Sequence, residues 1–182
     1  MSEEILLRAN FGVPLKALTA GMHWKNILEF GTCRGESTLA FSLAGADVVT
    51  FDNLREDNWR DIYTTEAGKN ASKTAQERFK KHGVYHKIDM IIADDKKLPL
   101  IDGLHWDCVF IDTSHQFEHT VLELEYSKNV TDNILLDDIG WSVKGKLTVM
   151  EAIEGFLKSN PKWFFTGRHD IYGVGWVFKK GE

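Results

Sequence analysis

The sequence has little of what marks a secreted, membrane-bound or nucleic-acid-binding protein. Its two cysteines, Cys33 and Cys108, are too few for a disulfide scaffold, so we expect no disulfide. No apolar run approaches membrane-spanning length, and the N-terminus carries acids where a signal peptide needs bases. Acids and bases are interspersed at a net charge of −5, so no basic block attracts a polyanion. We therefore expect a cytoplasmic protein with no nucleic-acid or membrane partner.

Length and composition favour one compact domain. The chain has 182 residues, of which 43% are hydrophobic and 12% aromatic, which is enough to bury one sizeable core. We expect a single domain over residues 1–182, with residues 1–25 as an N-terminal helical extension. The six tryptophans suit a flat organic substrate, core packing or the surface of a homo-oligomer.

Two apolar runs end in aspartate. Asp112 follows the run DCVFI, and Asp137 and Asp138 follow NILL. If both runs are strands of one parallel sheet, their carboxyl ends share a rim and the three carboxylates converge. Carboxylates crowded in this way raise one another's pKa unless a cation lies between them, which predicts a hard divalent metal such as Mg²⁺ or Ca²⁺. The alternative is that these aspartates only cap loops or helices.

A turn with two glycines, EFGTCRGEST, spans residues 29–38. Gly31 and Gly35 let the backbone turn tightly and approach a ligand, and the following helix points its N–H groups at that ligand. About 20 residues further on, the run DVVTFD ends in Asp52, where an acid that binds ribose hydroxyls is expected. Cys33 stands where a dinucleotide-binding turn needs glycine beside the pyrophosphate. A ligand without phosphates therefore fits better.

Strand and helix patterns alternate along the chain, as in a parallel sheet covered by helices. Continuous apolar runs predict buried parallel strands over residues 27–30, 47–51, 88–93, 108–111 and 134–136. Helices are predicted over residues 36–44, over residues 70–82 with Asn70 as cap, after the capping-box pair Thr113 and Gln116, and over residues 147–158. Strands over residues 163–166 and 173–178 are joined too closely for a crossover helix, so they must form an antiparallel hairpin.

This order resembles the class I S-adenosylmethionine-dependent methyltransferases, and within them the metal-dependent small-molecule O-methyltransferases and the cephalosporin-hydroxylase-like proteins. The resemblance runs from about Asn26 to Lys179. EFGTCRGEST, TFDN and IIADD are similar to the first three methyltransferase motifs, FIDTSHQFEH and LLDDIGW to the metal-binding half, and YGVGWVFK to the closing strand. The resemblance implies an α/β fold with a Rossmann-like doubly wound sheet. Five parallel strands and a C-terminal antiparallel hairpin make seven strands, with helices on both faces.

The resemblance also implies which residues bind S-adenosylmethionine. Asp52 is expected to accept both ribose hydroxyls, and Asp94, with Asp95 as a further candidate, the adenine amino group. The alternative for Asp94 and Asp95 is a polar turn. The methionine end of the ligand is expected to lie in a cradle made by Glu29, Gly31, Thr32, Gly35 and Ser37.

The implied reaction moves a methyl group from sulfur to a substrate oxygen. A divalent cation held by Asp112, Asp137 and Asp138 would bind two neighbouring substrate oxygens and lower the pKa of one of them. We expect His115, in the first turn of the next helix, to act as base or to touch substrate, or else to be an ordinary N-terminal helix residue. His119 lacks the third ligand of a zinc site and is expected at the surface.

The connection over residues 53–69 is long and mixes charged with aromatic residues, which is typical of a lid over a binding site. The alternative is a short helix that packs its aromatic residues on the core. Trp141, which comes shortly after Asp138, is a second candidate for the substrate wall.

We expect metal-assisted O-methylation of a small hydroxylated molecule. One alternative is an adenosylmethionine-binding protein without methyl transfer, as in the hydroxylase-like branch. Another is a nicotinamide-dependent oxidoreductase, against which Cys33 and the lack of a separate substrate domain both count. Methylation of nucleic-acid amino groups is disfavoured. Residues 112–115 read DTSH, whereas a resemblance to the enzymes that carry out that reaction would need Asp or Asn followed by two prolines.

Overall fold

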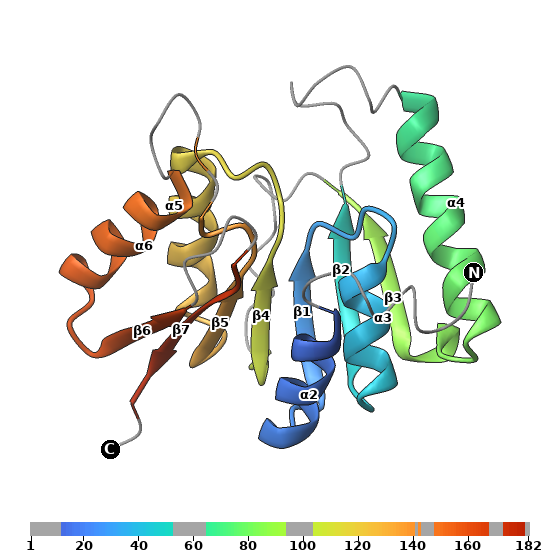
Figure 1. The fold of residues 1–182 in the computed structure, drawn as a ribbon, viewed down its shortest axis with the longest axis horizontal. Coiled ribbons are helices and arrows are strands. Elements are labelled where there is room, and N and C mark those ends of the chain that lie inside the picture. The colour runs from blue at the N-terminus through green and yellow to red at the C-terminus, as the bar shows by residue number, and fades with distance from the viewer. Residues whose placement is uncertain are drawn as a thin grey trace. The chain divides into compact units, whose positions relative to one another are not determined.

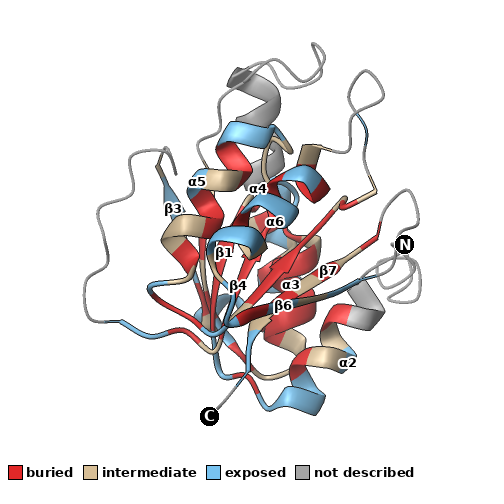
Figure 2. Cartoon of the chain, turned by 90° about the vertical axis from the view of Figure 1, so that its left-hand side faces the viewer, coloured by how far each residue is buried: buried red, intermediate tan, exposed pale blue. Residues whose placement is uncertain are grey.

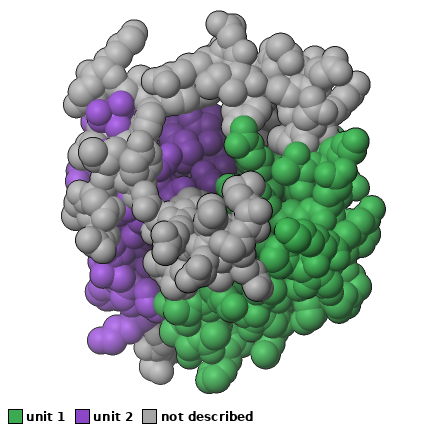
Figure 3. Space-filling model, turned by 45° about the vertical axis from the view of Figure 1, so that its right-hand side comes forward, with its two compact units in different colours: residues 1–98 green, residues 99–182 purple. Residues whose placement is uncertain are grey.

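The computed structural model describes residues 12–52, 65–93, 104–140, 142, 148–167 and 173–180. The chain forms two compact units, residues 1–98 and residues 99–182, which are coloured separately in Figure 3. Within the described residues, no helix is long and apolar enough to cross a membrane. Neither cysteine forms a disulfide: Cys33 is exposed and Cys108 is buried.

The first unit, residues 1–98, contains a parallel sheet with the strand order β3-β2-β1. Its strands are β1 (Asn26–Phe30), β2 (Asp47–Asp52) and β3 (Ile88–Ile92). Its helices are α2 (Gly12–Met22), α3 (Glu36–Leu43) and α4 (Thr65–Lys81), and the short 3-10 helix η2 (Tyr85–Lys87) precedes β3. In Figure 1, α2 and α3 lie side by side in front of β1 and β2.

Apolar burial fixes this arrangement. The interior of β1 is fully buried, and α3 ends where Gly45 adopts a φ of 103°, a conformation that favours glycine. Phe79 on α4 is completely buried and belongs to a core cluster with Leu39, Ala75, Val84 and Ile88. This cluster joins α3 and α4 to the start of β3.

The second unit, residues 99–182, contains the strand order β4-β5-β7-β6. Its strands are β4 (Cys108–Ile111), β5 (Asn133–Leu136), β6 (Trp163–Gly167) and β7 (Gly175–Lys179), and its helices are α5 (Phe117–Ser127) and α6 (Thr148–Ser159). β4 and β5 are parallel, whereas β7 is antiparallel to both β5 and β6. The predicted parallel strands and C-terminal hairpin are therefore confirmed.

The core of the second unit lies between its strands and its two neighbouring helices (Figures 1 and 2). Phe110, Ile134 and Leu135 are completely buried in the central strands. α6 buries Val149, Ile153 and Phe156, and the Phe156 ring meets the edge of Trp163 at a centroid distance of 5.5 Å. We also expected Leu157 to be buried, but it is only half-buried.

The start of α4 differs from the prediction. The helix begins at Thr65, so Asn70 lies inside it instead of capping it. Most of the residues between Thr65 and Asn70 are good helix formers, and an interior asparagine reduces helix stability only modestly. Residues 65–69 of the predicted lid are thus helical, and residues 53–64 lie outside the described residues.

β3 also differs from the prediction, because it is not buried throughout. Ile91 is 39% exposed and Ile92 60% exposed, whereas Ile88 is buried. β3 stands at the end of the strand order and pairs with β2. An apolar run alone does not distinguish a central strand from an edge strand.

A substitution at Gly35 can test how tightly α3 and α4 are packed. An added Cβ would lie 2.4 Å from the Phe79 ring, and Gly35 has a φ of 73°. Because Phe79 is completely buried and cannot turn aside, Gly35→Ala should lower the free energy of unfolding by about 1–3 kcal/mol. Gly155→Ala, in α6 with nothing within 4 Å, should leave stability equal or raise it by up to about 1 kcal/mol. Urea denaturation measures both changes, and equal stability of the two variants would contradict this packing.

Candidate active site

The glycine turn is fastened to the end of β2. Phe30 pairs with Phe51, and directly beyond this pair the Gly31 N–H donates to the Phe51 carbonyl at 2.8 Å. Gly31 has a φ of 100°. Cys33 has a φ of 45°, where glycine is usual, and its N–H donates to Asp52 Oδ2 at 2.7 Å. Cys33 therefore adopts a glycine-like conformation while its amide is held by the predicted ribose-binding carboxylate.

Glu29 joins β1 to the first turn of α3. Its side chain is completely buried, and Ser37 Oγ donates to Glu29 Oε1 at 2.5 Å. Thr38 Oγ1 donates to Glu29 Oε2. The structure thus brings Glu29 and Ser37 together, and it adds Thr38, which sequence reasoning missed although it lies one residue from a predicted site residue.

The other predicted cradle residues have different environments. Thr32 Oγ1 lies 2.6 Å from Thr50 Oγ1, in a buried hydrogen bond between the turn and β2. The Gly35 N–H donates to the Thr32 carbonyl at 2.7 Å, and Gly35 caps α3. Asp94 and Asp95 lie outside the described residues.

Arg78 of α4 braces the same turn from outside. Its guanidinium donates to the Arg34 carbonyl at 2.7 Å and lies 3.1 Å from a Glu36 carboxylate oxygen. The Arg78 side chain is only 12% exposed. Sequence reasoning missed this contact because no local pattern links residues 44 positions apart.

The aspartates of the second unit converge as predicted. Ile111 pairs with Leu136 in the parallel ladder, so Asp112 and Asp137 follow directly paired residues. His115 Nε2 lies 3.4 Å from Asp112 Oδ1 and 3.8 Å from Asp138 Oδ2. We define Asp112, Asp137 and Asp138 as the carboxylate cluster; two of its members, Asp112 and Asp138, lie beside the imidazole of His115.

The charges of this cluster are strongly coupled. Burial, followed by the charges of Asp112 and Asp138, raises the pKa of Asp137 to about 8. Burial also raises the pKa of Asp138, with a smaller contribution from Asp112 and an opposing one from His115. Burial acts to lower the pKa of His115, but the three carboxylates outweigh it and raise that pKa. Proton binding by Asp137 and His115 thus relieves the repulsion.

Asp138 of the cluster and the neighbouring His115 adopt rare backbone conformations. His115 has a φ of 54° and Asp138 a φ of 53°, in the left-handed region that non-glycine residues seldom adopt. Such residues gather at functional sites, where neighbouring structure holds them. The prediction that His115 lies in the first turn of a helix is wrong, because α5 begins at Phe117 and His115 belongs to the preceding loop.

The donor set of the cluster fits a hard divalent cation. Such cations prefer carboxylate oxygens, and Asp137 Oδ1 is buried with no hydrogen-bond partner among the described residues. The described residues do not, however, contain three or more side chains already arranged around a metal position. The chemistry of the residues supports a cation, while their geometry shows no coordination.

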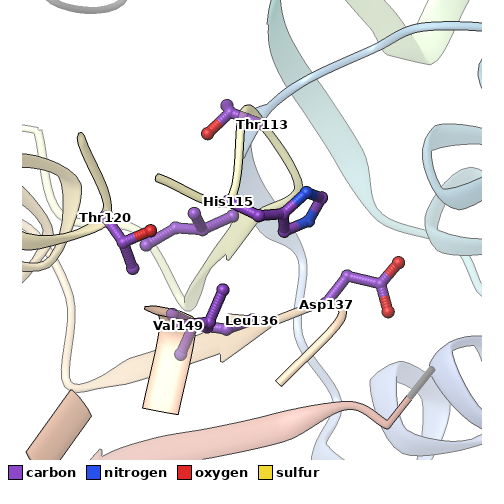
Figure 4. Close-up of a pocket in the computed structure, with 7 residues that line it drawn as sticks. Thr113, His115, Thr120, Leu136, Asp137 and Val149 are labelled. Carbon is purple, nitrogen blue, oxygen red and sulfur yellow. The ribbon is translucent and has the colours of Figure 1, made fainter. Parts of the chain in front are cut away.

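A small recess opens beside the cluster. Figure 4 shows the His115 ring and the Asp137 side chain on one side of it and Thr120 on the other. The recess is lined by Ile111, Thr113, His115, Thr120, Leu136, Asp137 and Val149. Its walls combine apolar side chains with a few polar groups. Trp141, the predicted substrate wall, lies outside the described residues.

His119 and the predicted capping box are corrected by the structure. His119 is only 5% exposed and therefore not at the surface. Gln116 is the N-cap of α5 without a side-chain capping bond, and the Thr113 hydroxyl donates to Glu123 instead, at 2.8 Å. Thr113 lies four residues before the first residue of α5, too far from its N-terminal N–H groups to cap it, which explains the different partner.

Comparison with known proteins identifies the fold. No protein-family model and no curated protein matches the sequence. Among solved structures, the O-methyltransferase of Bacillus cereus in complex with SAH has a TM-score of 0.72 at 16% identity, covering 94% of this chain and 81% of that chain. TomG of Streptomyces achromogenes, an O-methyltransferase involved in tomaymycin synthesis and bound to SAM, has a TM-score of 0.70 at 16% identity, covering 95% and 81%.

A third structure, the SAH-bound methyltransferase PaMTH1 of Podospora anserina, has a TM-score of 0.66 at 18% identity, covering 93% of this chain and 78% of that chain. At these identities the likeness defines the fold. The chain has the Rossmann-like fold of these methyltransferases, and the predicted fold class is confirmed.

The raised pKa values predict a direction for the pH dependence of stability. Between about pH 4 and pH 8 the folded protein keeps a proton on Asp137 that the unfolded chain has lost. Stability without divalent metal should therefore fall as pH rises through this range, by up to about 1.4 kcal/mol per pH unit for each proton. The raised pKa of His115 acts in the same direction.

Asp137→Asn should flatten this dependence and raise stability at pH 8, because the carboxylate that must keep a proton is gone. The control is Glu154→Gln, which removes an exposed carboxylate from α6 of the same unit. Urea denaturation in EDTA at pH 5, 6, 7 and 8 measures both variants. A slope in Asp137→Asn as steep as in wild type would refute the assignment.

Proposed function

We propose that this protein transfers the methyl group of S-adenosylmethionine to a hydroxyl oxygen of a small molecule. The observation that carries the proposal is the glycine turn whose Cys33 amide is held by Asp52, in a fold shared with O-methyltransferases that bind SAM or SAH. Gly31 leaves the backbone open to close approach, and a carboxylate at the end of β2 can accept two ribose hydroxyls.

In this proposal, the buried cradle residues act mainly by fixing the turn. Ser37 donates a hydrogen bond to Glu29, and Thr32 shares one with Thr50 of β2, so these side chains bond within the protein. Asp94 and Asp95 are proposed to accept from the adenine amino group. The nicotinamide alternative is disfavoured because a side chain occupies position 33, where a pyrophosphate needs glycine.

The carboxylate cluster favours catalysis over binding alone. Asp112, Asp137 and Asp138 are proposed to hold Mg²⁺ or Ca²⁺, which when bound supplies Lewis acidity that lowers the pKa of a coordinated substrate hydroxyl. His115 Nε2 is proposed to accept the hydroxyl proton. The substrate oxygen then bonds to the methyl carbon as the carbon–sulfur bond breaks, which leaves S-adenosylhomocysteine and a proton on His115.

Asp52→Ala should weaken adenosylhomocysteine binding. Hydrogen bonds to a charged group contribute about 1.5–3 kcal/mol, so affinity should fall at least about tenfold. Asp89→Ala, which removes an exposed carboxylate from neighbouring β3, should bind as wild type does. Isothermal titration calorimetry measures both affinities. Unchanged binding in Asp52→Ala, or no binding by wild type, would rule out the proposed cofactor site.

Asp138→Asn should weaken Mg²⁺ binding and methyl transfer together, because it removes one charge from the cluster while hardly changing volume. Affinity for adenosylhomocysteine should stay unchanged, and stability in EDTA should hold or rise as repulsion is relieved. Melting curves with EDTA, Mg²⁺ and Ca²⁺ and a transfer assay on a panel of catechols measure these effects. A wild-type melting temperature indifferent to millimolar Mg²⁺ and Ca²⁺ would remove the metal from the proposal.

A further inference from the structure

The loop over residues 112–116, between β4 and α5, contains both Asp112 and His115. Its conformation is not one that the chain adopts readily, because His115 has a φ of 54°. A non-glycine residue stays in this region only where its surroundings hold it there. The contacts that hold this loop therefore determine where the His115 imidazole lies.

Three successive residues of the loop are each bound by a side chain from a helix. The Thr113 hydroxyl donates to Glu123 Oε1 at 2.8 Å. Ser114 Oγ and His119 Nδ1 share a hydrogen bond of 2.7 Å. Thr148 Oγ1, at the start of α6, donates to the His115 carbonyl at 2.6 Å. The loop is thus held at three consecutive positions.

Glu123 and His119 lie one turn apart on α5, and both face inward. Their exposed fractions are 4% and 5%, and His119 Nε2 lies 3.7 Å from Glu123 Oε1. Burying a carboxylate and an imidazole is unfavourable unless their partners compensate, and apolar residues would serve packing alone at least as well. They form hydrogen bonds with Thr113 and Ser114, the two residues between Asp112 and His115.

We propose that Glu123 and His119 are positioning residues of the reaction. They fix Thr113 and Ser114, and thereby hold Asp112 and His115 in place beside the other two carboxylates of the cluster. The inference rests on the proposed function, since it assigns the cluster a metal and a substrate. Neither Glu123 nor His119 is proposed to touch the metal or the substrate. Residues that orient metal ligands through hydrogen bonds typically change metal affinity about 10–100-fold when removed.

The test compares three single variants of the full chain. Glu123→Ala removes the acceptor for Thr113, and His119→Ala the partner of Ser114. Glu123→Gln keeps a carbonyl oxygen that can accept from Thr113. Mg²⁺ affinity is measured by calorimetry, and the amide exchange of residues 112–116 by mass spectrometry. Both Ala variants should lose about 10–100-fold in Mg²⁺ affinity and exchange faster in this loop, whereas Glu123→Gln should stay close to wild type.

Ser127→Ala is the matched control for stability. Ser127 is a completely buried polar residue of the same helix, and its hydroxyl donates to the Glu123 carbonyl at 2.6 Å. This variant should lose stability but keep the Mg²⁺ affinity and loop exchange of wild type. Two results would overturn the inference. One is that Glu123→Ala changes Mg²⁺ affinity and loop exchange no more than its loss of stability accounts for, as judged from Ser127→Ala. The other is that Glu123→Gln does not restore wild-type Mg²⁺ affinity.

Adenosylhomocysteine binding separates this inference from the proposed function. It should be unchanged in all variants, because the glycine turn and Asp52 lie in the other unit of the chain. Wild type that binds neither adenosylhomocysteine nor Mg²⁺ contradicts the proposed function. In that case amide exchange still decides: faster exchange of residues 112–116 in Glu123→Ala, but not in Ser127→Ala, supports the positioning role, and equal exchange refutes it.

Discussion

The mutual repulsion of three carboxylates at the ends of two paired strands is the constraint on which the second unit depends. The ladder between β4 and β5 fixes Ile111 opposite Leu136, so Asp112 and Asp137 cannot move apart without breaking the sheet. Burial removes much of the water that would otherwise screen them. Protons and the imidazole of His115 relieve part of this repulsion, and a divalent cation would relieve more.

In the first unit, by contrast, a buried carboxylate is stabilised by hydrogen bonds from the protein itself. Glu29 is as deeply buried as any residue of the protein, yet hydroxyls of Ser37 and Thr38 donate to both of its oxygens. Asp137 has a buried oxygen without a hydrogen-bond partner among the described residues. A charge that is satisfied within the chain stabilises the fold, whereas one that is left in need of a partner indicates a ligand. This difference favours a structural role for Glu29 and a functional one for Asp137.

Much of this could be predicted from the sequence because strand ends are local features. Short apolar runs marked the strands, and their parallel direction brought Asp112 to Asp137 without knowledge of any contact. Other features depend on distant partners. The exposure of Ile92 follows from the place of β3 in the sheet, and the contact of Arg78 with Arg34 crosses 44 positions. The sequence predicts His119 at the surface, and only packing shows that it and Glu123 face inward.

The protonation of the carboxylate cluster is coupled to the proposed metal binding and to the protonation of His115. In the proposed function, a proton and a divalent cation would compete for Asp137, since a metal ligand must be ionised and the pKa of this carboxyl lies near 8. The same competition reaches His115, because its raised pKa depends on the uncompensated carboxylates around it. A cation that neutralises those carboxylates removes the reason for the imidazole to hold a proton. Neutral imidazole is the form that can accept a proton from a hydroxyl, so in the proposed function the conditions that favour metal binding would also prepare His115 to act as base.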